Sequence, residues 1–332
     1  MRTGVAAGHR GFFHQSAFYG SDEEFLAVVT PFLADGLGAG EPTVVAFSPA
    51  NEALIRAAFG NDSGLTYLEG EAQYQRPAGA IRGYREIMAN LVARGATQIR
   101  IVGDVPHPGL GVPWEWWARY EALVNHAFAE FPLWGLCPYD TRTAPPEVLD
   151  QVRRTHPHLA TPHGSLANPA FEDPREFLNR ITPRWHDPLE LTRPLFELRD
   201  PPAAAARDAV TQAGRATELS GADISGLVLA ATEAITNAVL HGRPPVRVRI
   251  WAQPRRVVVA VTDHGTGPDN PFVGLIPARE SDDGVGGLGL WLAHQMCSYV
   301  SLNRDSDGFT VRLIAETPHP QQSADGAHSG TG

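Results

Sequence analysis

Lysine is missing from this sequence of 332 residues, and all 27 of its basic side chains are arginine. The absence excludes chemistry that needs a lysine amine, such as a Walker A phosphate loop or a Schiff base. Any nucleotide site in this chain must therefore hold phosphate groups without an ammonium group. A coding sequence rich in G and C would account for the bias toward arginine.

Cysteine is also scarce, with Cys137 and Cys297 each in apolar surroundings. Such cysteines are more often buried reduced thiols than members of a disulfide. No apolar run at the N-terminus is long enough for a signal peptide, and none approaches the ~18 residues of a membrane span. The net charge of −10 argues against a nucleic-acid partner, because phosphate binding needs a basic surface. We therefore expect a cytoplasmic protein with no membrane or nucleic-acid partner.

The length and composition suit two globular domains, since hydrophobic residues make up 43% of the chain and charged residues 19%. In the first half, helix periodicity alternates with short apolar strands. This alternation predicts an α/β fold with a mostly parallel sheet covered on both faces. Ser21, with Glu24 three residues later, predicts the start of a helix that runs to about Leu37.

The rest of the chain divides into three segments. Prolines over residues 157–194 predict an irregular linker, and we assign the histidine cluster of His156, His158 and His163 to it. Over residues 195–316 helices and strands fall in separate groups, which predicts an α/β two-layer sandwich with an antiparallel sheet. The polar composition of residues 317–332 predicts a disordered tail.

The helix predicted over residues 222–240 carries Glu233 and Asn237 one turn apart. Its buried stripe is expected to consist of Val228, Ala231, Ile235 and Val239. A carboxylate and an amide stacked in this way can orient water and bind a hard cation through oxygen. Alone, such a pair is more typical of a solvated helix face.

A second motif follows the strand predicted over residues 256–262, where Asp263 precedes Gly265 and Gly267. A carboxylate at a strand end can accept a hydrogen bond from an adenine amine. The glycines let main chain approach a flat ring with no side chain between them. Alone, the same letters are more typical of an ordinary loop turn.

A third motif is the glycine run of residues 284–289, which contains Gly286, Gly287 and Gly289 and leads into a predicted helix. Main-chain N–H groups in such a loop, with the helix N-terminus behind them, can bind an anion without lysine. A lone glycine run is equally typical of a flexible loop.

Taken in order over residues 231–292, the three motifs resemble the gyrase, histidine kinase and MutL ATPase superfamily. The resemblance covers residues 195–316 and implies a Bergerat-type domain that binds ATP with Mg²⁺. It implies that Asn237 holds Mg²⁺ and the phosphates, and that Asp263 reads adenine. The other cofactor-binding residues that it implies are Gly265 and Gly267 at the adenine pocket floor, and Gly286, Gly287 and Gly289 at a mobile lid.

Within this superfamily, residues 232–242 (TEAITNAVLHG) are most similar to the anti-sigma factor serine kinases. That resemblance implies that Glu233 is the general base for a substrate hydroxyl. It implies a sigma factor and an anti-sigma-antagonist protein as partners, and kinases of this type tend to form homodimers. The chain departs from the pattern at Phe309, where relatives usually have a threonine, and in a short acidic lid over residues 268–283.

The N-terminal half resembles the sensory domain called MEDS, on residues 13–26 (FHQSAFYGSDEEFL) and 136–141 (LCPYDT). The resemblance spans residues 10–156 and implies a RecA-like fold without a working phosphate loop. Candidate ligand residues here are His14, Tyr19, Asp104, His107, Trp114, Trp116 and Trp117. Trp116 and Trp117 are more typical of packing aromatics, and no partner spacing supports metal binding by His14 or His107.

Two alternatives to an anti-sigma factor kinase remain open. A histidine kinase needs a phosphoacceptor histidine on a dimerising helical hairpin before the ATPase domain. Residues 157–194 are instead broken by proline and have no heptads, which argues against this alternative. A nucleotide-gated module, in contrast, would bind its partner without phosphorylating it.

Overall fold

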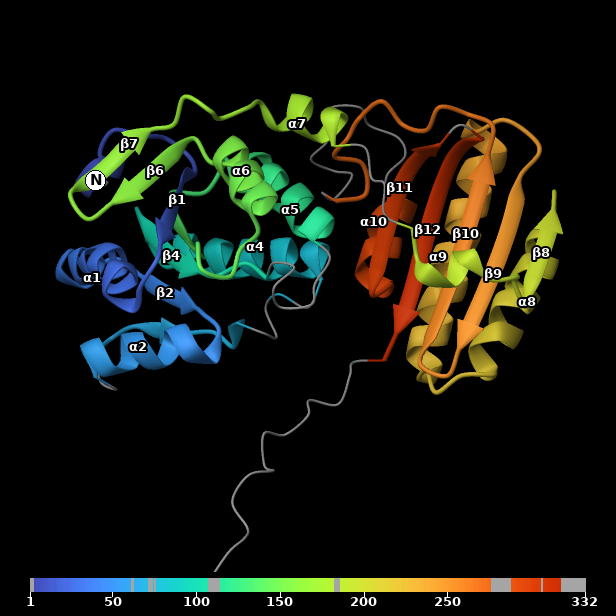
Figure 1. Cartoon of the computed structure of the whole chain (residues 1–332), viewed down its shortest axis with the longest axis horizontal. Coiled ribbons are helices and arrows are strands. Elements are labelled where there is room, and N and C mark those ends of the chain that lie inside the picture. Colours follow the sequence, from blue (N-terminus) through green and yellow to red (C-terminus); the bar gives the residue numbers. More distant parts are fainter. Residues whose placement is uncertain are drawn as a thin grey trace, which may run out of the picture. The chain divides into compact units, whose positions relative to one another are not determined.

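The computed structural model describes residues 3–60, 63–70, 74, 76–106, 114–181, 186–275, 288–305 and 307–317. The chain forms two compact units (Figure 1). The first comprises Met1–Trp185 together with Pro268–Gln295, and the second comprises His186–Gly267 together with Met296–Gly332. Each unit has its own sheet.

A seven-stranded sheet forms the centre of the first unit, in the order β3-β2-β4-β5-β1-β6-β7. Its strands are β1 (Phe13–Tyr19), β2 (Thr43–Ala46), β3 (Thr66–Tyr67), β4 (Ile99–Gly103), β5 (Leu133–Asp140), β6 (His158–Thr161) and β7 (Gly164–Ala167). Neighbouring strands are parallel except for β6 and β7. The mostly parallel sheet expected from the alternating pattern is therefore present.

Helices cover both faces of this sheet. The helices of the first unit are η1 (Gly4–Ala6), α1 (Asp22–Gly38), α2 (Pro49–Phe59), α4 (Pro77–Ala93), α5 (Trp114–Ala127), α6 (Pro146–Thr155), α7 (Pro174–Arg180) and most of α10 (Leu288–Met296). Val45 of β2 packs with α1 and α2, whereas its neighbours Val44 and Ala46 pack with α4 and α5. This alternation is expected of a strand buried on both sides. The predicted cap of α1 is confirmed, because Ser21 Oγ accepts a hydrogen bond from Glu24 N at 3.2 Å.

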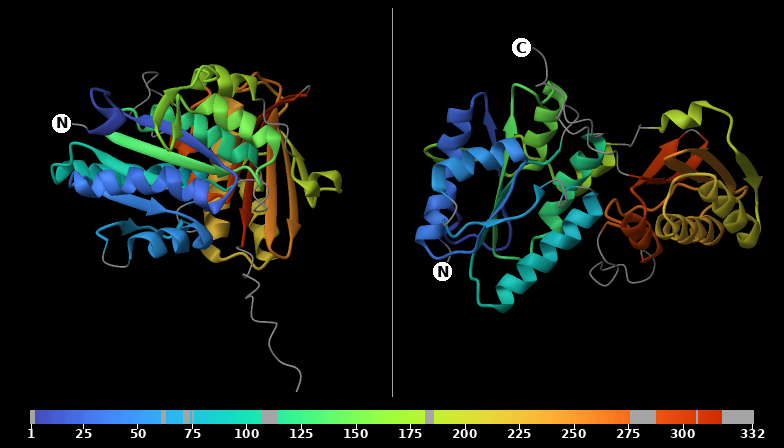
Figure 2. Two further views of the ribbon diagram at one scale, coloured as in Figure 1. Left: turned by 60° about the vertical axis from the view of Figure 1, so that its left-hand side comes forward. Right: turned by 90° about the horizontal axis from the view of Figure 1, so that it is seen from below.

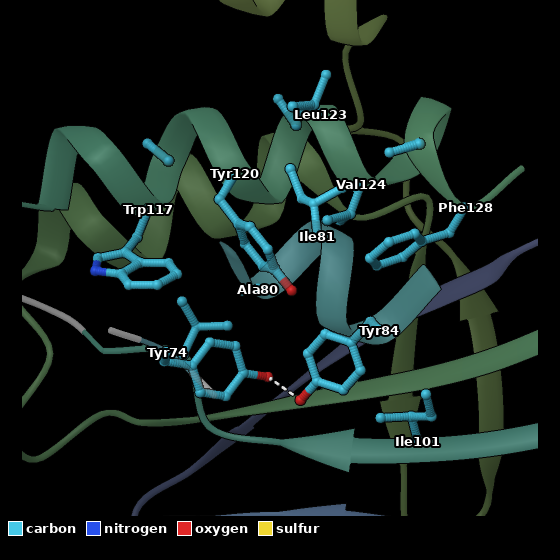
Figure 3. Packing of buried hydrophobic residues seen from close by; sticks show 14 of the residues in the cluster. Tyr74, Ala80, Ile81, Tyr84, Ile101, Trp117, Tyr120, Leu123, Val124 and Phe128 are labelled. Atoms are coloured by element: carbon cyan, nitrogen blue, oxygen red, sulfur yellow. Dashed lines mark hydrogen bonds between the residues drawn. The ribbon is translucent and has the colours of Figure 1, made fainter. Parts of the chain in front are cut away.

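The core under α4 and α5 is rich in aromatic side chains (Figure 3). Trp117 packs edge-on against Tyr74 and Tyr120, and the Tyr84 hydroxyl donates to the Tyr74 hydroxyl at 2.9 Å. Trp117 is 1% exposed. The packing role expected for it is therefore confirmed.

The irregular linker expected over residues 157–194 is not what the structure has there. This stretch contains β6, β7, α7 and the short helix η3 (Pro188–Leu191). β6 extends the first sheet by pairing with β1, with Gln15 opposite His158. His156 is fully buried, so its assignment to a linker is wrong. The pairing partner of this segment lies far away along the chain, and local composition therefore could not reveal it.

The second unit is a five-stranded antiparallel sheet in the order β11-β12-β10-β9-β8. Its strands are β8 (Phe196–Arg199), β9 (Arg247–Gln253), β10 (Arg256–Asp263), β11 (Tyr299–Asp305) and β12 (Gly308–Glu316). Helices α8 (Ala203–Arg215) and α9 (Gly221–His241) pack against each other and against this sheet (Figure 2). The grouping of helices and strands that the sequence predicts is confirmed.

Helix α9 differs from expectation in two respects. Val239, expected in the buried stripe, is 65% exposed. The buried face consists of Gly226, Leu227, Ala230, Ala231, Ala234, Ile235 and Ala238, whose mostly small side chains allow a close approach to β10 and β12. By length and composition alone α9 also matches a membrane span, which the sequence analysis did not expect of any segment, but its buried face packs against β10 and β12.

Arg100 provides a test of the packing in the first unit. It is 1% exposed, donates to Glu41 Oε2 at 2.6 Å and to Phe32 O at 2.7 Å, and stacks on Trp134. We expect Arg100→Ala to lower the free energy of unfolding by about 3–5 kcal/mol, because it breaks a buried ion pair and leaves the Glu41 carboxylate with only neutral donors, Thr3 and Gln98. Arg82→Ala is the control and should cost less than about 0.5 kcal/mol, since its contact with Glu86 is exposed. Urea unfolding measures both, and equal effects would contradict the assigned role of Arg100.

Candidate functional site

Asp263 ends β10 and is buried, with 4% of its surface exposed. Its Oδ1 accepts hydrogen bonds from the main-chain N–H groups of Gly265 at 2.6 Å and Arg243 at 3.1 Å. The His264 N–H donates in turn to the Arg243 carbonyl at 2.8 Å. The carboxylate thus ties the turn after α9 to the turn after β10, and it brings the first two sequence motifs together.

Bare main chain surrounds this carboxylate. A Cβ added at Gly242 would lie 2.4 Å from Asp263 Cγ, and one at Gly265 would lie 2.6 Å from Asp263 Oδ1. Gly267 has a φ of +69°, and a Cβ there would lie 2.3 Å from the Phe309 ring. These distances are shorter than packed atoms permit, so each position needs glycine. Sequence analysis identified Gly265 and Gly267 but missed Gly242, whose signal was its place at the end of the α9 motif.

Phe309 lies directly opposite Asp263 in the β10–β12 ladder. Paired residues of an antiparallel ladder point to the same face, so the aromatic ring and the carboxylate are neighbours. The next residue, Thr310, points to the other face and shares a hydrogen bond of 2.9 Å with the Thr262 hydroxyl. The threonine adjacent to Phe309 therefore does not place its hydroxyl beside Asp263.

Glu233 and Asn237 lie on α9, one turn apart, and both are half-buried. No hydrogen bond to a described residue engages either side chain, so their oxygens are available to a ligand. Asn237 directly precedes Ala238, whose carbonyl accepts from Gly242 N at 3.1 Å. Along the chain, the Asn237 amide therefore lies just before the turn whose Arg243 N–H donates to Asp263. This arrangement provides two oxygen donors suited to a hard cation.

The third motif is only partly described. Gly286 and Gly287 fall outside the described residues, and Gly289 is the second residue of α10. The phosphate-binding role of these three glycines remains a prediction.

A hollow of about 730 Å³ opens near Asp263, with Pro245, Arg247, Thr262, His264, Gly265, Thr266, Arg304, Asp307 and Gly308 in its wall. It shares Gly265 with the site but does not include Asp263, Asn237 or Glu233. Thr262 and Asp263 are consecutive strand residues and point to opposite faces of the sheet. The hollow is therefore a neighbour of the site that does not contain the Asp263 carboxylate.

In the first unit, two of the predicted ligand residues lie together at the carboxyl ends of parallel strands. Asp104 accepts from Ser48 N at 2.7 Å and Oγ at 2.6 Å, and from Asn51 Nδ2 at 2.9 Å. Asn51 Nδ2 also reaches the Tyr19 hydroxyl at 3.2 Å. Burial raises the pKa of Asp104, and burial raises that of Tyr19 to about 12. This edge is where open α/β sheets usually bind ligands.

The other predicted ligand residues of this half do not join that group. His14 lies within β1 and is 1% exposed, and His107 is outside the described residues. Trp114 belongs to the core under α4 and α5, as Trp117 does, whereas Trp116 on the same helix is half-buried.

Two protein-family models match the chain. Residues 13–157 match the model described as MEDS, the MEthanogen/methylotroph, DcmR Sensory domain. Residues 197–315 match the model described as a histidine kinase-like ATPase domain. The resemblances to the MEDS domain and to the histidine kinase-like ATPase domains are thereby confirmed. No curated protein matches the chain.

The close contacts of Gly242 predict a specific sensitivity to substitution. Gly242→Ala should lower the free energy of unfolding by about 1–3 kcal/mol, because its methyl group would overlap the Asp263 carboxylate. Gly221→Ala is the matched control. Gly221 lies at the other end of α9, as its first residue, and a Cβ there would meet only open space. Its effect should stay within about 0.5 kcal/mol. Thermal unfolding of the two variants decides the matter, and a harmless Gly242→Ala would show that the turn is not tightly packed on Asp263.

Proposed function

Because the chain joins a MEDS domain to a histidine kinase-like ATPase domain, we propose that it is an ATP-binding regulator of the anti-sigma factor type. The N-terminal domain, RecA-like in this proposal, senses a signal. The C-terminal domain, of the Bergerat type, uses ATP with Mg²⁺ to phosphorylate a serine or threonine of an anti-sigma-antagonist protein. The observation that carries the proposal is the buried Asp263 carboxylate surrounded by bare main chain.

The surroundings of Asp263 fit a purine. Both of its main-chain hydrogen bonds end on Oδ1, which leaves Oδ2 to accept from an exocyclic amine. Gly242 and Gly265 place main chain without side chains against the carboxylate, so neither position has a side chain that competes with a ligand for Oδ2. Phe309, on the same face, offers this ring an aromatic surface instead of a hydroxyl.

Glu233 and Asn237 fit the polar end of the same ligand. The Asn237 carbonyl oxygen would hold Mg²⁺ together with the phosphates, since magnesium prefers oxygen ligands. Bound ATP supplies the γ-phosphoryl group for transfer. The Glu233 carboxylate would accept the proton of the attacking serine or threonine hydroxyl and orient that hydroxyl.

A nucleotide-gated module that binds its partner without phosphorylating it is the second candidate. The position of Phe309 favours it, because the ring packs on Gly267 where relatives of the kinase type usually have a threonine. A sigma factor or an antagonist protein remains the proposed partner in both cases. The two candidates share the ATP site and differ only in phosphoryl transfer.

Calorimetry with ATP and Mg²⁺ tests the site itself. We expect Asp263→Asn to weaken ATP binding by about 10- to 100-fold, since a hydrogen bond to a charged group contributes about 1.5–3 kcal/mol. Asp208→Asn, an exposed position on α8, makes the same chemical change away from the site and should leave affinity unaltered. Absence of binding heat with the wild-type chain would refute the proposal, and so would equal affinity of Asp263→Asn and the wild type.

A phosphoryl-transfer assay separates the two candidates. It measures transfer of label from γ-labelled ATP to a candidate antagonist protein, chosen from the genes that neighbour the gene for this chain. If the chain is a kinase, Glu233→Ala should slow transfer by about 10²- to 10⁴-fold while ATP still binds. Glu218→Ala removes an exposed carboxylate of the same unit and should transfer at the wild-type rate. ATP binding without transfer would favour the module. Transfer by Glu233→Ala at the wild-type rate would contradict the role of Glu233 as base.

A further inference from the structure

Four side chains that the nucleotide site does not use meet inside the first unit. They are His14 on β1, Glu121 on α5, Cys137 on β5 and His156 at the end of α6, and their ligand atoms all lie within 4.8 Å of one another. His14 Nε2 and His156 Nε2 lie 3.5 and 3.4 Å from Glu121 Oε2, and Cys137 Sγ lies 3.6 Å from His14 Nε2. Three polar atoms and a sulfur thus share one small space.

The bonds around the imidazoles fix which nitrogen faces this space. His156 Nδ1 contacts the Val152 carbonyl at 2.8 Å, and a carbonyl only accepts, so Nδ1 carries the hydrogen. Asn125 Nδ2 donates to the carbonyls of Glu121, Ala122 and Thr155, which leaves its Oδ1 to accept from His14 Nδ1 at 3.0 Å. Assigned from these partners, both Nε2 atoms bear lone pairs that point at Glu121.

The Glu121 carboxylate is oriented in the same manner. Tyr139 donates its hydroxyl proton to Glu121 Oε1 at 2.6 Å, which leaves Oε2 facing the two imidazoles. Among the residues that the structure describes, neither Glu121 Oε2 nor His156 Nε2 has a hydrogen-bond partner, although both are fully buried. A buried polar atom without a partner costs free energy and calls for an explanation.

Direct ion pairs between these side chains do not supply the explanation. Burial lowers the pKa of His14 well below its ordinary value and that of His156 to about 4. Burial also raises the pKa of Glu121 to about 8 and the pKa of the Cys137 thiol. The contacts of 3.4 and 3.5 Å are also too long for good hydrogen bonds.

We propose that His14, Glu121, Cys137 and His156 form a tetrahedral site for a divalent transition metal of the zinc class. Zn²⁺ binds imidazole nitrogen and carboxylate oxygen at about 2.0–2.2 Å and thiolate sulfur at about 2.3 Å, so atoms at the corners of such a tetrahedron are about 3.3–3.6 Å apart. The three contacts of 3.4, 3.5 and 3.6 Å fit these separations.

The charge balance also suits a buried cation. Binding displaces the Glu121 and Cys137 protons to solvent, and two anionic and two neutral ligands then neutralise a divalent ion. Nitrogen and sulfur donors select zinc or a similar transition metal over Mg²⁺ or Ca²⁺.

The second layer of the cluster resembles that of a metal centre. Each imidazole donates its other ring N–H to an oxygen, and Tyr139 donates to the carboxylate. Hydrogen bonds of this kind to the ligand side chains fix the orientation of those side chains toward the metal. Four protein ligands leave no open coordination position, so the metal has a structural role. It joins β1, β5, α5 and the end of α6, and its loading sets the stability of the sensory domain.

Cobalt titration of the metal-free, tag-free full chain tests the proposal, because Co²⁺ in a tetrahedral thiolate site absorbs visibly. We expect one equivalent to bind with a thiolate charge-transfer band and to raise the melting temperature. Cys137→Ser should lose the band and the rise in melting temperature. Cys297→Ser, which removes the other thiol of the chain, should retain both. Absence of saturable binding, or the same spectrum from Cys137→Ser and the wild type, would overturn the proposal.

Tyr139→Phe gives a second test with little change of shape. It removes the hydrogen bond to Glu121 and leaves all four proposed metal ligands unchanged. Loss of such an outer bond should weaken Co²⁺ binding by about 10- to 100-fold with the thiolate band retained. Unchanged affinity in a folded Tyr139→Phe chain would contradict the assigned role of Glu121. The readout is independent of ATP, so its failure leaves the proposed function intact.

Discussion

The position of the Asp263 carboxylate is the constraint on which the second unit depends. A buried charge needs compensation, and here two main-chain N–H groups from different turns provide it. Those turns must approach so closely that Gly242 and Gly265 admit no side chain. The small buried face of α9 serves the same requirement, because alanine and glycine allow that helix to lie close to β10 and β12. Glycine and alanine positions scattered along the chain therefore share one physical cause.

Buried polar groups in the first unit also need compensation, and they obtain it in two different ways. Around Arg100, the buried charge is met by Glu41 and a carbonyl, so that group is satisfied within the protein. Around Glu121, the ring N–H groups of both imidazoles are engaged elsewhere, and the contacts of 3.4 and 3.5 Å to Glu121 Oε2 are longer than good hydrogen bonds. A cation resolves this conflict where more protein hydrogen bonds cannot. Arg100 therefore belongs to a structural ion pair that is complete within the protein, whereas the polar atoms around Glu121 form a site that a ligand would complete.

Sequence analysis succeeded where the information is local. The Ser21 cap, the alternation of helices and strands, and the place of Asp263 at a strand end each depend on residues a few positions apart. It failed at His156, because burial of that side chain depends on β6 pairing with β1 across most of the first unit. The cluster around Glu121 was missed for the same reason, since its four members come from four separate elements and share no spacing. Val239 was misplaced because apolar periodicity alone does not show which turn of a helix the sheet covers.

The two candidate cation sites differ in their donor atoms, and the donor atoms determine which cation each site prefers. Glu233 and Asn237 present only oxygen and are half-buried, which suits Mg²⁺ with its retained water molecules. The cluster around Glu121 presents two nitrogens, one sulfur and one oxygen, which suits zinc better than a strongly hydrated ion such as Mg²⁺. A transition metal in the first unit would therefore not exchange with the magnesium that accompanies a nucleotide. In these two proposals, the chain holds a permanent structural ion in one unit and a transient one in the other, and neither site needs a lysine.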